Sequence, residues 1–352
     1  MAILAWETII EALLAGERPP APEPEPVTLT LDRGVHHCIE GDNLAVLRAL
    51  HPAYQGQIRL AYLDPPYNTG QRRMYCDQFA LSVTAYRAYL QQLDPSGRLA
   101  RRIPEKAGRS HLGWLTMLIP RLQALQPLLH PTGMLFCSID DTEFAHLGVT
   151  LRRLFGESNY LTTIIWVGRI PSNSVAYIST VHEYILCLTP DRVAWEDQRA
   201  AEGRPPFTTL WRGTEVGTTA TARRELRRLL GGRGQQFDTP KPTGLIRRML
   251  DIATRPQGGD LVLDPFAGSA TTADAVLTAN AADGGDRRFL LIQEPLTTGQ
   301  ADYPTVAAVG AARLARVAAQ LYPPGSLWSA RPAVQFHQVP PRGVDQDTPV
   351  AA

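Results

Sequence analysis

The feature that most constrains this chain is a pair of short, mainly apolar runs that each end at an aspartate. Ile58–Leu63 leads into Asp64, and Leu261–Leu263 leads into Asp264. Short apolar runs between polar or Gly/Pro loops are typical of strands buried on both faces of a parallel sheet. We therefore expect an α/β fold with a doubly wound, mostly parallel sheet. Such sheets bind ligands beyond the carboxyl ends of their strands, where both aspartates are expected.

The same periodicities predict the neighbouring elements. Helical spacing of apolar residues predicts helices at residues 3–15, Trp114–Leu129, Phe144–Phe155 and Thr271–Leu277. Short apolar runs predict further strands at Met134–Ile139, Leu161–Val167 and Phe289–Gln293. Between Gly168 and Gln236 the pattern breaks down, although Tyr184–Leu188 resembles a strand.

These patterns divide the chain into five parts. We expect an N-terminal helix and Pro-rich linker at 1–26, a first half of the main domain at 27–167, an insertion at 168–236, a second half at 237–330 and a C-terminal tail at 331–352. The alternating prolines from Pro19 to Pro26 favour a stiff, extended linker.

Composition indicates a globular protein without a membrane span. Of 352 residues, 44% are hydrophobic and 20% are charged. No apolar run approaches the roughly 20 residues of a membrane-spanning helix, and the N-terminus lacks the basic region of a secretory signal. We therefore expect a cytoplasmic protein. The four cysteines lie far apart, and the His36-His37 pair has no cluster of other ligands nearby, so we expect free thiols and no structural metal.

Charge is uneven along the chain although the net charge is only +1. Residues 71–112 contain eight basic and three acidic residues, and residues 168–236 contain ten arginines. Such asymmetry suits a surface that meets phosphate, although on composition alone a structural excursion is nearly as good an explanation of the second segment.

Asp64-Pro65-Pro66-Tyr67 is the strongest candidate for catalysis. Neither proline donates a backbone hydrogen bond, so the turn is rigid and its carbonyls are available as acceptors. The Asp64 carboxylate and the Pro65 carbonyl could accept both protons of one exocyclic amine, which would make its nitrogen nucleophilic. Tyr67 offers a face on which an extruded base can stack. The alternative is a Pro-rich turn with a capping aspartate.

The second candidate is the loop of small residues that follows Asp264. Gly268 and Ser269 would allow a ligand to approach the backbone closely, but the loop has neither GxGxxG nor Walker spacing. A nucleoside without phosphate, such as S-adenosylmethionine, therefore suits it better than NAD. Glu294, after the next predicted strand, is placed to bind ribose hydroxyls. An ordinary tight turn and an ordinary surface acid are the alternatives.

Five segments of the sequence, in this order, are similar to segments of one protein family. They are Ile39-Glu-Gly-Asp-Asn-Leu44, Ala61-Tyr-Leu-Asp-Pro-Pro-Tyr-Asn-Thr-Gly70, Gly133-Met-Leu-Phe-Cys-Ser-Ile-Asp-Asp141, His182-Glu-Tyr184 and Phe237-Asp-Thr-Pro-Lys-Pro242. The chain resembles the β-group DNA amino-methyltransferases, and especially the modification subunits of type III restriction-modification systems. The resemblance implies a Rossmann-like methyltransferase sheet, S-adenosylmethionine as cofactor and double-stranded DNA as substrate.

The resemblance also implies roles for individual residues. Asp64, Pro65, Pro66 and Tyr67 would be catalytic, and the insertion at 168–236 would hold the target-recognition region. The cofactor would be bound by Asp42, Asn43, Lys241, Pro242, Asp264, Phe266, Ala267, Gly268, Ser269 and Glu294, with Asp42 and Asn43 near its adenine and Lys241 and Pro242 near its methionine end. A restriction subunit and a second copy of the chain are the partners it suggests.

The sequence departs from the family pattern in two places. Ala270 stands where the family's cofactor loop usually has glycine, which puts cofactor affinity in doubt. The chain is also much shorter than a typical type III modification subunit. Aspartate in the first position of the catalytic motif favours N6 of adenine as the target. N4 of cytosine is the alternative target within the family, and a non-catalytic DNA-binding subunit on the same scaffold is the alternative function.

Overall fold

Nine strands form one sheet in the order β6-β4-β5-β3-β2-β7-β8-β1-β9. The structure is a computed structural model that describes residues 2–19, 21, 23–71, 73–93, 105–169, 178–232, 237, 239–323 and 333–339. The strands are β1 (His36–Glu40), β2 (Ile58–Leu63), β3 (Leu129–Ile139), β4 (Tyr160–Val167), β5 (Glu183–Leu188), β6 (Leu210–Arg212), β7 (Leu261–Asp264), β8 (Arg288–Gln293) and β9 (Val334–Gln338). Within these residues, every pairing is parallel except the two made by β5. The mostly parallel α/β sheet expected from the sequence is confirmed.

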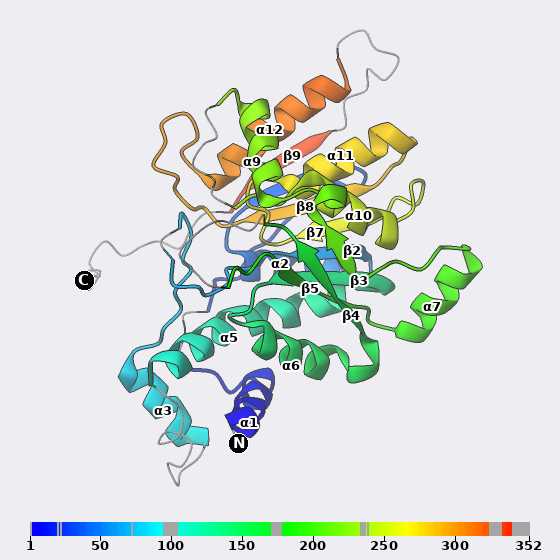
Figure 1. Ribbon diagram of the computed structural model, residues 1–352. Helices are drawn as coiled ribbons and strands as arrows, with labels where there is room; N and C mark the ends of the chain where they lie inside the picture. The colour runs from blue at the N-terminus through cyan, green and yellow to red at the C-terminus, as the bar shows by residue number, and fades with distance from the viewer. Residues whose placement is uncertain are drawn as a thin grey trace.

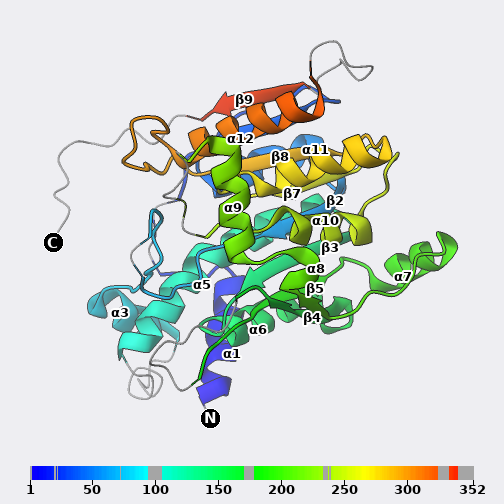
Figure 2. The ribbon, with the colours of Figure 1, turned by 45° about the horizontal axis from the view of Figure 1, so that its top comes forward.

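Helices cover both faces of the sheet (Figure 1 and Figure 2). One layer contains α1 (Ala2–Leu14), α2 (Asn43–Tyr54), α3 (Val83–Leu93), α5 (Glu105–Leu125) and α6 (Phe144–Phe155). The other contains α8 (Gly213–Val216), α9 (Thr219–Leu230), α10 (Thr243–Ala253), α11 (Thr271–Asp283) and α12 (Val306–Leu321). Helix α7 (Arg192–Ala201) projects to one side of the sheet and contacts β3.

Strand β2 shows why the apolar runs are continuous. Ala61 and Leu63 belong to the core beneath α2 and α5, whereas Leu60 and Tyr62 belong to the core beneath α10 and α11. All four side chains are buried. A strand covered on both faces has no solvent-facing positions, so its sequence does not alternate between apolar and polar residues.

Several element boundaries differ from those expected. Helix α6 has the expected bounds, but α5 ends at Leu125 rather than Leu129, and β3 starts at Leu129 rather than Met134. A short 3-10 turn, Gln126–Leu128, follows the helix at this point and contains Pro127, which has no backbone N–H to donate. Helix α11 continues beyond the expected Leu277 to Asp283. Most of the expected tail lies outside the described residues, and its described part contains β9.

Helix α1 packs on α5 and α6 rather than standing apart. Ile9, Ile10 and Leu13 are buried in the same core as the strands. The helix end is tied down by Gln123, whose side chain donates to the Leu14 carbonyl at 2.8 Å. Among the described residues, none of the helices has the length and apolarity needed to cross a membrane.

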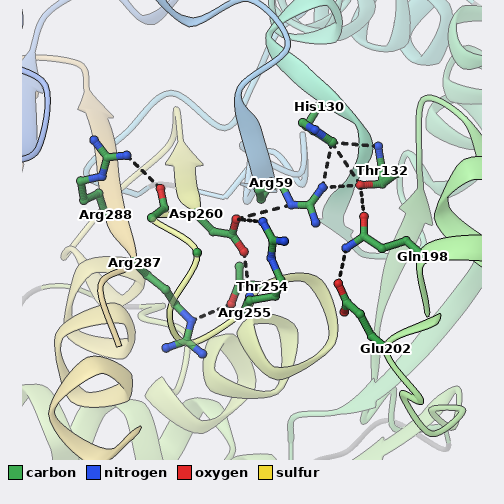
Figure 3. A network of polar contacts seen from close by, with 12 residues as sticks. Arg59, His130, Thr132, Gln198, Glu202, Thr254, Arg255, Asp260, Arg287 and Arg288 are labelled. Atoms are coloured by element: carbon green, nitrogen blue, oxygen red, sulfur yellow. Dashed lines mark hydrogen bonds and ion pairs between the residues drawn. The ribbon is translucent and has the colours of Figure 1, made fainter. Parts of the chain in front are cut away.

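A polar network joins the amino ends of the central strands (Figure 3). Arg59, at the start of β2, lies 2.8 Å from the His130 ring and 3.6 Å from Asp260, which precedes β7. Arg59 also donates to the Thr132 hydroxyl, which in turn donates to the side-chain amide oxygen of Gln198 of α7. The network lies at the edge opposite to the ends of β2 and β7, and fixes the strands in register there.

His36 is a buried histidine that the fold holds neutral. It is 5% exposed, stacks on Phe289 with ring centroids 4.2 Å apart, and its Nδ1 accepts the Phe289 N–H. Burial, with the charge of nearby Arg288, lowers the pKa of His36 to about 4. A proton on Nδ1 would remove this acceptor and place a charge in the core.

We predict that His36 makes the fold acid-sensitive. Because its folded-state pKa lies below the ordinary value of about 6.5, its contribution is complete above pH 6.5 and is lost as the pH falls through 4. The stability advantage of the wild type over His36→Gln should therefore shrink by up to about 3 kcal/mol between pH 7 and pH 4. Denaturant unfolding at both pH values measures this, and a difference that does not change with pH contradicts it.

Candidate active site

The predicted site residues gather at the carboxyl edge of neighbouring strands. Asp64 follows β2, Asp264 ends β7, Glu294 follows β8 and Asn43 starts α2 just after β1. These strands are adjacent, in the order β2-β7-β8-β1. The chain turns in opposite directions from β2 and β7, so a cavity opens between them, as expected at the switch point of a doubly wound sheet.

The turn after β2 holds its side chains rigidly. Tyr67 donates its hydroxyl proton to Asp64 Oδ1 at 2.8 Å, and Trp114 Nε1 donates to the Pro66 carbonyl at 2.7 Å. The Pro66 carbonyl is therefore not available to a ligand, contrary to the expectation that both proline carbonyls are free. The Pro65 carbonyl and Asp64 Oδ2 have no hydrogen-bond partner among the described residues. Both residues line the cavity.

Asn68 anchors the end of this turn. Its φ of 62° lies in the left-handed region that asparagine tolerates better than most residues. Its backbone N–H donates to Asp77 Oδ1 at 2.8 Å, and its side-chain amide donates to Glu143 and to the Ser110 carbonyl. With Asn68 buried and its amide bonded on several sides, the catalytic turn has one defined conformation.

Glu143 joins this anchor to the N-terminal helix. The buried carboxylate lies 2.8 Å from Nδ1 of both His111 and His146, and Trp6 of α1 packs edge-on against both imidazole rings. The His111, Glu143 and His146 side chains form a group whose ligand atoms lie within 4.8 Å of one another, close enough to hold a metal ion. Within the described residues, the Glu143 carboxylate is already hydrogen-bonded to both histidines and to Asn68. We infer that this group holds the turn after β2 in place.

Lys241 lies among three oxygens from two separate parts of the chain, the turn after β2 and the start of β5. Its Nζ is 2.8 Å from the Tyr67 hydroxyl, 2.9 Å from Asp64 Oδ1 and 3.0 Å from Glu183 Oε2. Lys241 and Glu183 are buried. We call Asp64, Tyr67, Glu183 and Lys241 the carboxylate–lysine cluster. With two carboxylates and one ammonium, its net charge is −1 when all three groups are ionised.

The cluster separates the pKa values of its two carboxyl groups. Burial raises the pKa of Asp64 in spite of Lys241. Burial also acts to raise the pKa of Glu183, but Lys241 and Arg169 together hold it below its ordinary value. Burial would lower the pKa of Lys241, yet the two carboxylates raise it, so the lysine stays an ammonium ion. Of the two carboxyl groups, Asp64 therefore accepts a proton more readily.

The loop after β7 lies close to a ligand cavity but offers no phosphate cradle. The amides of Phe266, Ala267, Gly268 and Ala270 already donate to Asp264, Ile292, Gln293 and Ala267. Burial raises the pKa of Asp264 to about 7, although bonds from Thr272 and the Phe266 amide oppose the shift. Since these amides are engaged, the loop suits a ligand that needs shape and apolar contact rather than anion binding.

Two residues in this loop have left-handed backbone conformations. Gly268 has φ 50°, and a Cβ there would lie 2.9 Å from Cζ of Phe237. Ala270 has φ 59°, but its methyl group faces Gly310 of α12 and it does not line the main cavity. The alanine at 270 therefore adds its methyl group behind the loop, away from the expected ligand.

The other cofactor candidates lie at different distances from the cavity. Asn43 lines it, donates to the Pro265 carbonyl at 3.1 Å and accepts from Arg121. Glu294 also lines it and pairs with Arg121 at 3.3 Å. Asp42 does not line the cavity; it caps α2 by accepting the Ala45 N–H at 2.9 Å.

Lys241 and Pro242 are adjacent in sequence but lie differently with respect to the cavity. Lys241 lines the cavity and contacts the turn after β2. Pro242 does not line the cavity; it precedes α10 and lies against Gly217, between α8 and α9, where an added Cβ would lie 2.6 Å from the Pro242 Cβ.

Sequence reasoning missed Glu183, Arg121 and Arg313. Glu183 had a signal, because it lies in the His182-Glu-Tyr184 segment, but it is the first residue of its strand rather than the residue after it. Antiparallel β5 brings that first residue to the edge where the parallel strands end. Arg313 of α12 is fully buried and donates to Asp274 at 2.8 Å and to Ser269 and Thr271, which fixes the loop from behind.

Comparison with known proteins agrees with this geometry. A family model described as DNA methylase matches residues 58–285, more than half of the chain. The chain belongs to the DNA methylase family. The matched range includes the turn after β2, the carboxylate–lysine cluster and the loop after β7.

Individual relatives cover the chain to different extents. The StyLTI Mod subunit of a type III restriction-modification enzyme from Salmonella typhimurium is 28% identical over 85% of this chain and 60% of its own length. The EcoP15I Mod subunit from Escherichia coli is 34% identical over 45% of this chain and 24% of its own. The type II methyltransferase M.KpnI from Klebsiella pneumoniae is 24% identical over 73% of this chain and 80% of its own. This DNA methylase thus spans less than two thirds of the length of the first two relatives.

We predict that two matched substitutions, one on each side of Ser269, affect the binding of S-adenosylmethionine to different extents. Ala270→Gly removes a methyl group that faces α12, so the dissociation constant for S-adenosylmethionine should change by less than about two-fold. Gly268→Ala places a Cβ against Phe237 at a left-handed φ, which costs about 1–2 kcal/mol, so binding should weaken by about ten-fold. Calorimetric titration measures both, and a larger effect from Ala270→Gly contradicts the placement of the two residues.

Proposed function

We propose that this DNA methylase transfers a methyl group from S-adenosylmethionine to the exocyclic amino group of a base flipped out of double-stranded DNA. N6 of adenine is the favoured target and N4 of cytosine the alternative. The observation that carries the proposal is a pair of acceptors, Asp64 Oδ2 and the Pro65 carbonyl, that belong to two residues lining the cavity and have no hydrogen-bond partner among the described residues.

The two acceptors match the two protons of an exocyclic amine. Its nitrogen is a poor nucleophile in a free base, because the lone pair is conjugated with the ring. Two hydrogen bonds aimed from Asp64 and Pro65 would favour a pyramidal nitrogen whose lone pair is available. Since Oδ1 of Asp64 is held by Tyr67 and Lys241, the carboxylate is already oriented and needs little reorganisation during the reaction.

Tyr67 gives the base its stacking surface. The hydroxyl is held by Asp64, Glu183 and Lys241, so the ring has a defined orientation at the cavity wall. Every base has a π face, so stacking supports an extruded base without selecting its identity. Selection of the base therefore rests on the hydrogen bonds to its exocyclic group. The aspartate of the motif favours adenine through the resemblance of this sequence to adenine-specific enzymes.

The residues of the second half fit S-adenosylmethionine. Glu294 can accept ribose hydroxyls, Phe266 offers an apolar face, and Gly268 leaves room for close approach of the ligand. The carboxylate–lysine cluster has a net charge of −1, which complements a sulfonium ion. When bound, S-adenosylmethionine supplies a methyl group on positively charged sulfur. Asp64 and Pro65 align the amine with that methyl group.

Residues 168–236 are the proposed target-recognition region. Helix α9 exposes Arg223, Arg224, Arg227 and Arg228, and buries Leu226 and Leu229 against its neighbours. Arginines on one helix face suit contact with DNA phosphates, which position a protein without reading sequence. Part of this region, and residues 94–104 of the basic segment, lie outside the described residues.

The proposed partners follow from the substrate and from the relatives. Double-stranded DNA is the substrate, so the proposed place of action is the cytoplasm. The relatives named as Mod subunits support a restriction subunit as a second partner. A second copy of the chain is the partner that the sequence resemblance suggests.

We predict that the wild type methylates DNA and that Asp64→Asn does not. Unmethylated genomic DNA and S-adenosylmethionine are incubated with each protein, and nucleosides are measured by mass spectrometry after digestion. N6-methyladenine should appear with the wild type and fall by at least about 100-fold with Asp64→Asn, because the neutral amide of asparagine is a weaker acceptor of the amine protons than a carboxylate. Asp141→Asn, an exposed aspartate near the end of β3, is the matched control and should retain activity.

Two results would change the proposal. N4-methylcytosine in place of N6-methyladenine would move the target to cytosine and leave the mechanism intact. No modified base with any DNA, together with no binding of S-adenosylmethionine, would refute the proposed activity and favour a DNA-binding subunit on this scaffold.

A further inference from the structure

The carboxylate–lysine cluster contains a carboxylate more than charge pairing of Lys241 requires. Asp64 alone would neutralise the ammonium, yet Glu183 Oε2 also lies 3.0 Å from Nζ. Burying a second carboxylate is unfavourable unless it is compensated. Besides Lys241, the compensating cation of Glu183 is Arg169, which lies 3.2 Å from Oε1 and is 46% exposed. Glu183 comes from β5, which runs opposite to its neighbours and so delivers this side chain to the reaction edge.

We propose that the cluster takes up the proton released by the reacting amine, and that Glu183 is the positioning residue that allows Asp64 to accept it. The inference rests on the proposed methyl transfer. It assigns a role to Glu183 and Lys241 that methyl transfer alone does not require.

The proton balance of the reaction defines the need. The amine lone pair forms a bond to the methyl carbon, the carbon–sulfur bond breaks, and its electron pair stays on sulfur, which becomes a neutral thioether. The nitrogen then carries the methyl group, two protons and a positive charge. One N–H proton passes to Asp64 Oδ2, and the N–H bonding pair returns to nitrogen as its lone pair. The cluster charge changes from −1 to zero.

Glu183 keeps the lysine compensated after this transfer. Without Glu183, protonation of Asp64 would leave the Lys241 ammonium buried with no carboxylate partner, which is a costly state. With Glu183 present, Lys241 pairs with Glu183 when Asp64 is neutral. Lysine and glutamate then form a neutral pair throughout, and Asp64 is free to change its charge.

The surrounding groups agree with this division of roles. The pKa of Asp64 is raised and that of Glu183 is lowered, so the proton resides on Asp64. Arg169 donates to Glu183 Oε1 at 3.2 Å, and its side chain is 46% exposed, which links Glu183 to solvent. Among the described residues, the charged and titratable groups facing the pair are Tyr62, Tyr67, Tyr75, Cys137, Asp140, Arg169, Lys241 and Asp264.

The test uses full-length wild type, Glu183→Gln, Lys241→Met and the double variant in single-turnover methylation across pH. Glu183→Gln should lower the rate constant by on the order of 100-fold, with the dissociation constants for S-adenosylmethionine and DNA changed by less than about three-fold. Because Glu183 raises the pKa of Asp64, its removal should also move the acid limb of the pH–rate profile to lower pH. Glu202→Gln, at the opposite edge of the sheet, is the control and should leave rate and profile unchanged.

The double variant separates a charge role from a structural one. Lys241→Met with Glu183→Gln restores a cluster charge of −1 on Asp64, so it should be faster than Glu183→Gln alone. The inference is overturned if the double variant is slower than both single variants, or if Glu183→Gln keeps the wild-type acid limb. Thermal unfolding shows whether each variant is folded. If Glu183→Gln is not folded, Glu183→Asp replaces it and should retain the acid limb of the wild-type pH–rate profile. A wild type that binds S-adenosylmethionine but methylates no DNA refutes the proposed function itself, and this inference with it.

Discussion

The buried contact of Lys241 with Asp64 and Glu183 is the interaction on which the site depends. An ammonium ion and two carboxylates are removed from water, and each is tolerable only because the others are present. The three residues are 119 and 58 positions apart along the chain, so the contact also ties β2, β5 and the segment before α10 to one another. Loss of Lys241 would leave Asp64 without a cation, whereas loss of either carboxylate would leave Lys241 paired with the other.

The topology of the sheet makes this contact possible. Parallel β2 and β7 end at the same edge, which brings the turn after Asp64 next to the loop after Asp264. Antiparallel β5 starts at that edge and contributes Glu183. Behind these residues, Asn68 and Glu143 fix the turn, and Arg313 fixes the loop. The cavity wall is therefore built by side chains that are themselves held from the core.

The sequence predicts much of this arrangement because some signals are local. An apolar run that ends at an acid indicates a strand and the edge on which its acid lies, so Asp64 and Asp264 could be placed together. Helix α6 is delimited by its own apolar spacing. The catalytic turn is visible because two prolines and an aromatic restrict one short segment.

The remaining features depend on contacts distant in sequence. Glu183 is the first residue of its strand, and only the antiparallel direction of β5 shows that it reaches the site. The contacts of Lys241 with Asp64 and Glu183 could not be predicted, because these residues are far away along the chain. The Ala270 methyl group faces Gly310 of α12, which is distant in sequence, so its direction could not be predicted from the loop alone. The end of α5 at Leu125 was missed because the apolar spacing continues past it into the start of β3.

The most direct test of this account is a double-mutant cycle on the free energy of unfolding, with Lys241→Met and Glu183→Gln. Lys241→Met leaves Asp64 without a cation and Glu183 with only the half-exposed Arg169, and should cost about 3–5 kcal/mol. In the Glu183→Gln background, the same substitution should cost at least about 1.5 kcal/mol less, because one of the two carboxylates is gone. A small cost for Lys241→Met that is the same in both backgrounds would contradict the account, since it would mean that the lysine is not paired in the core.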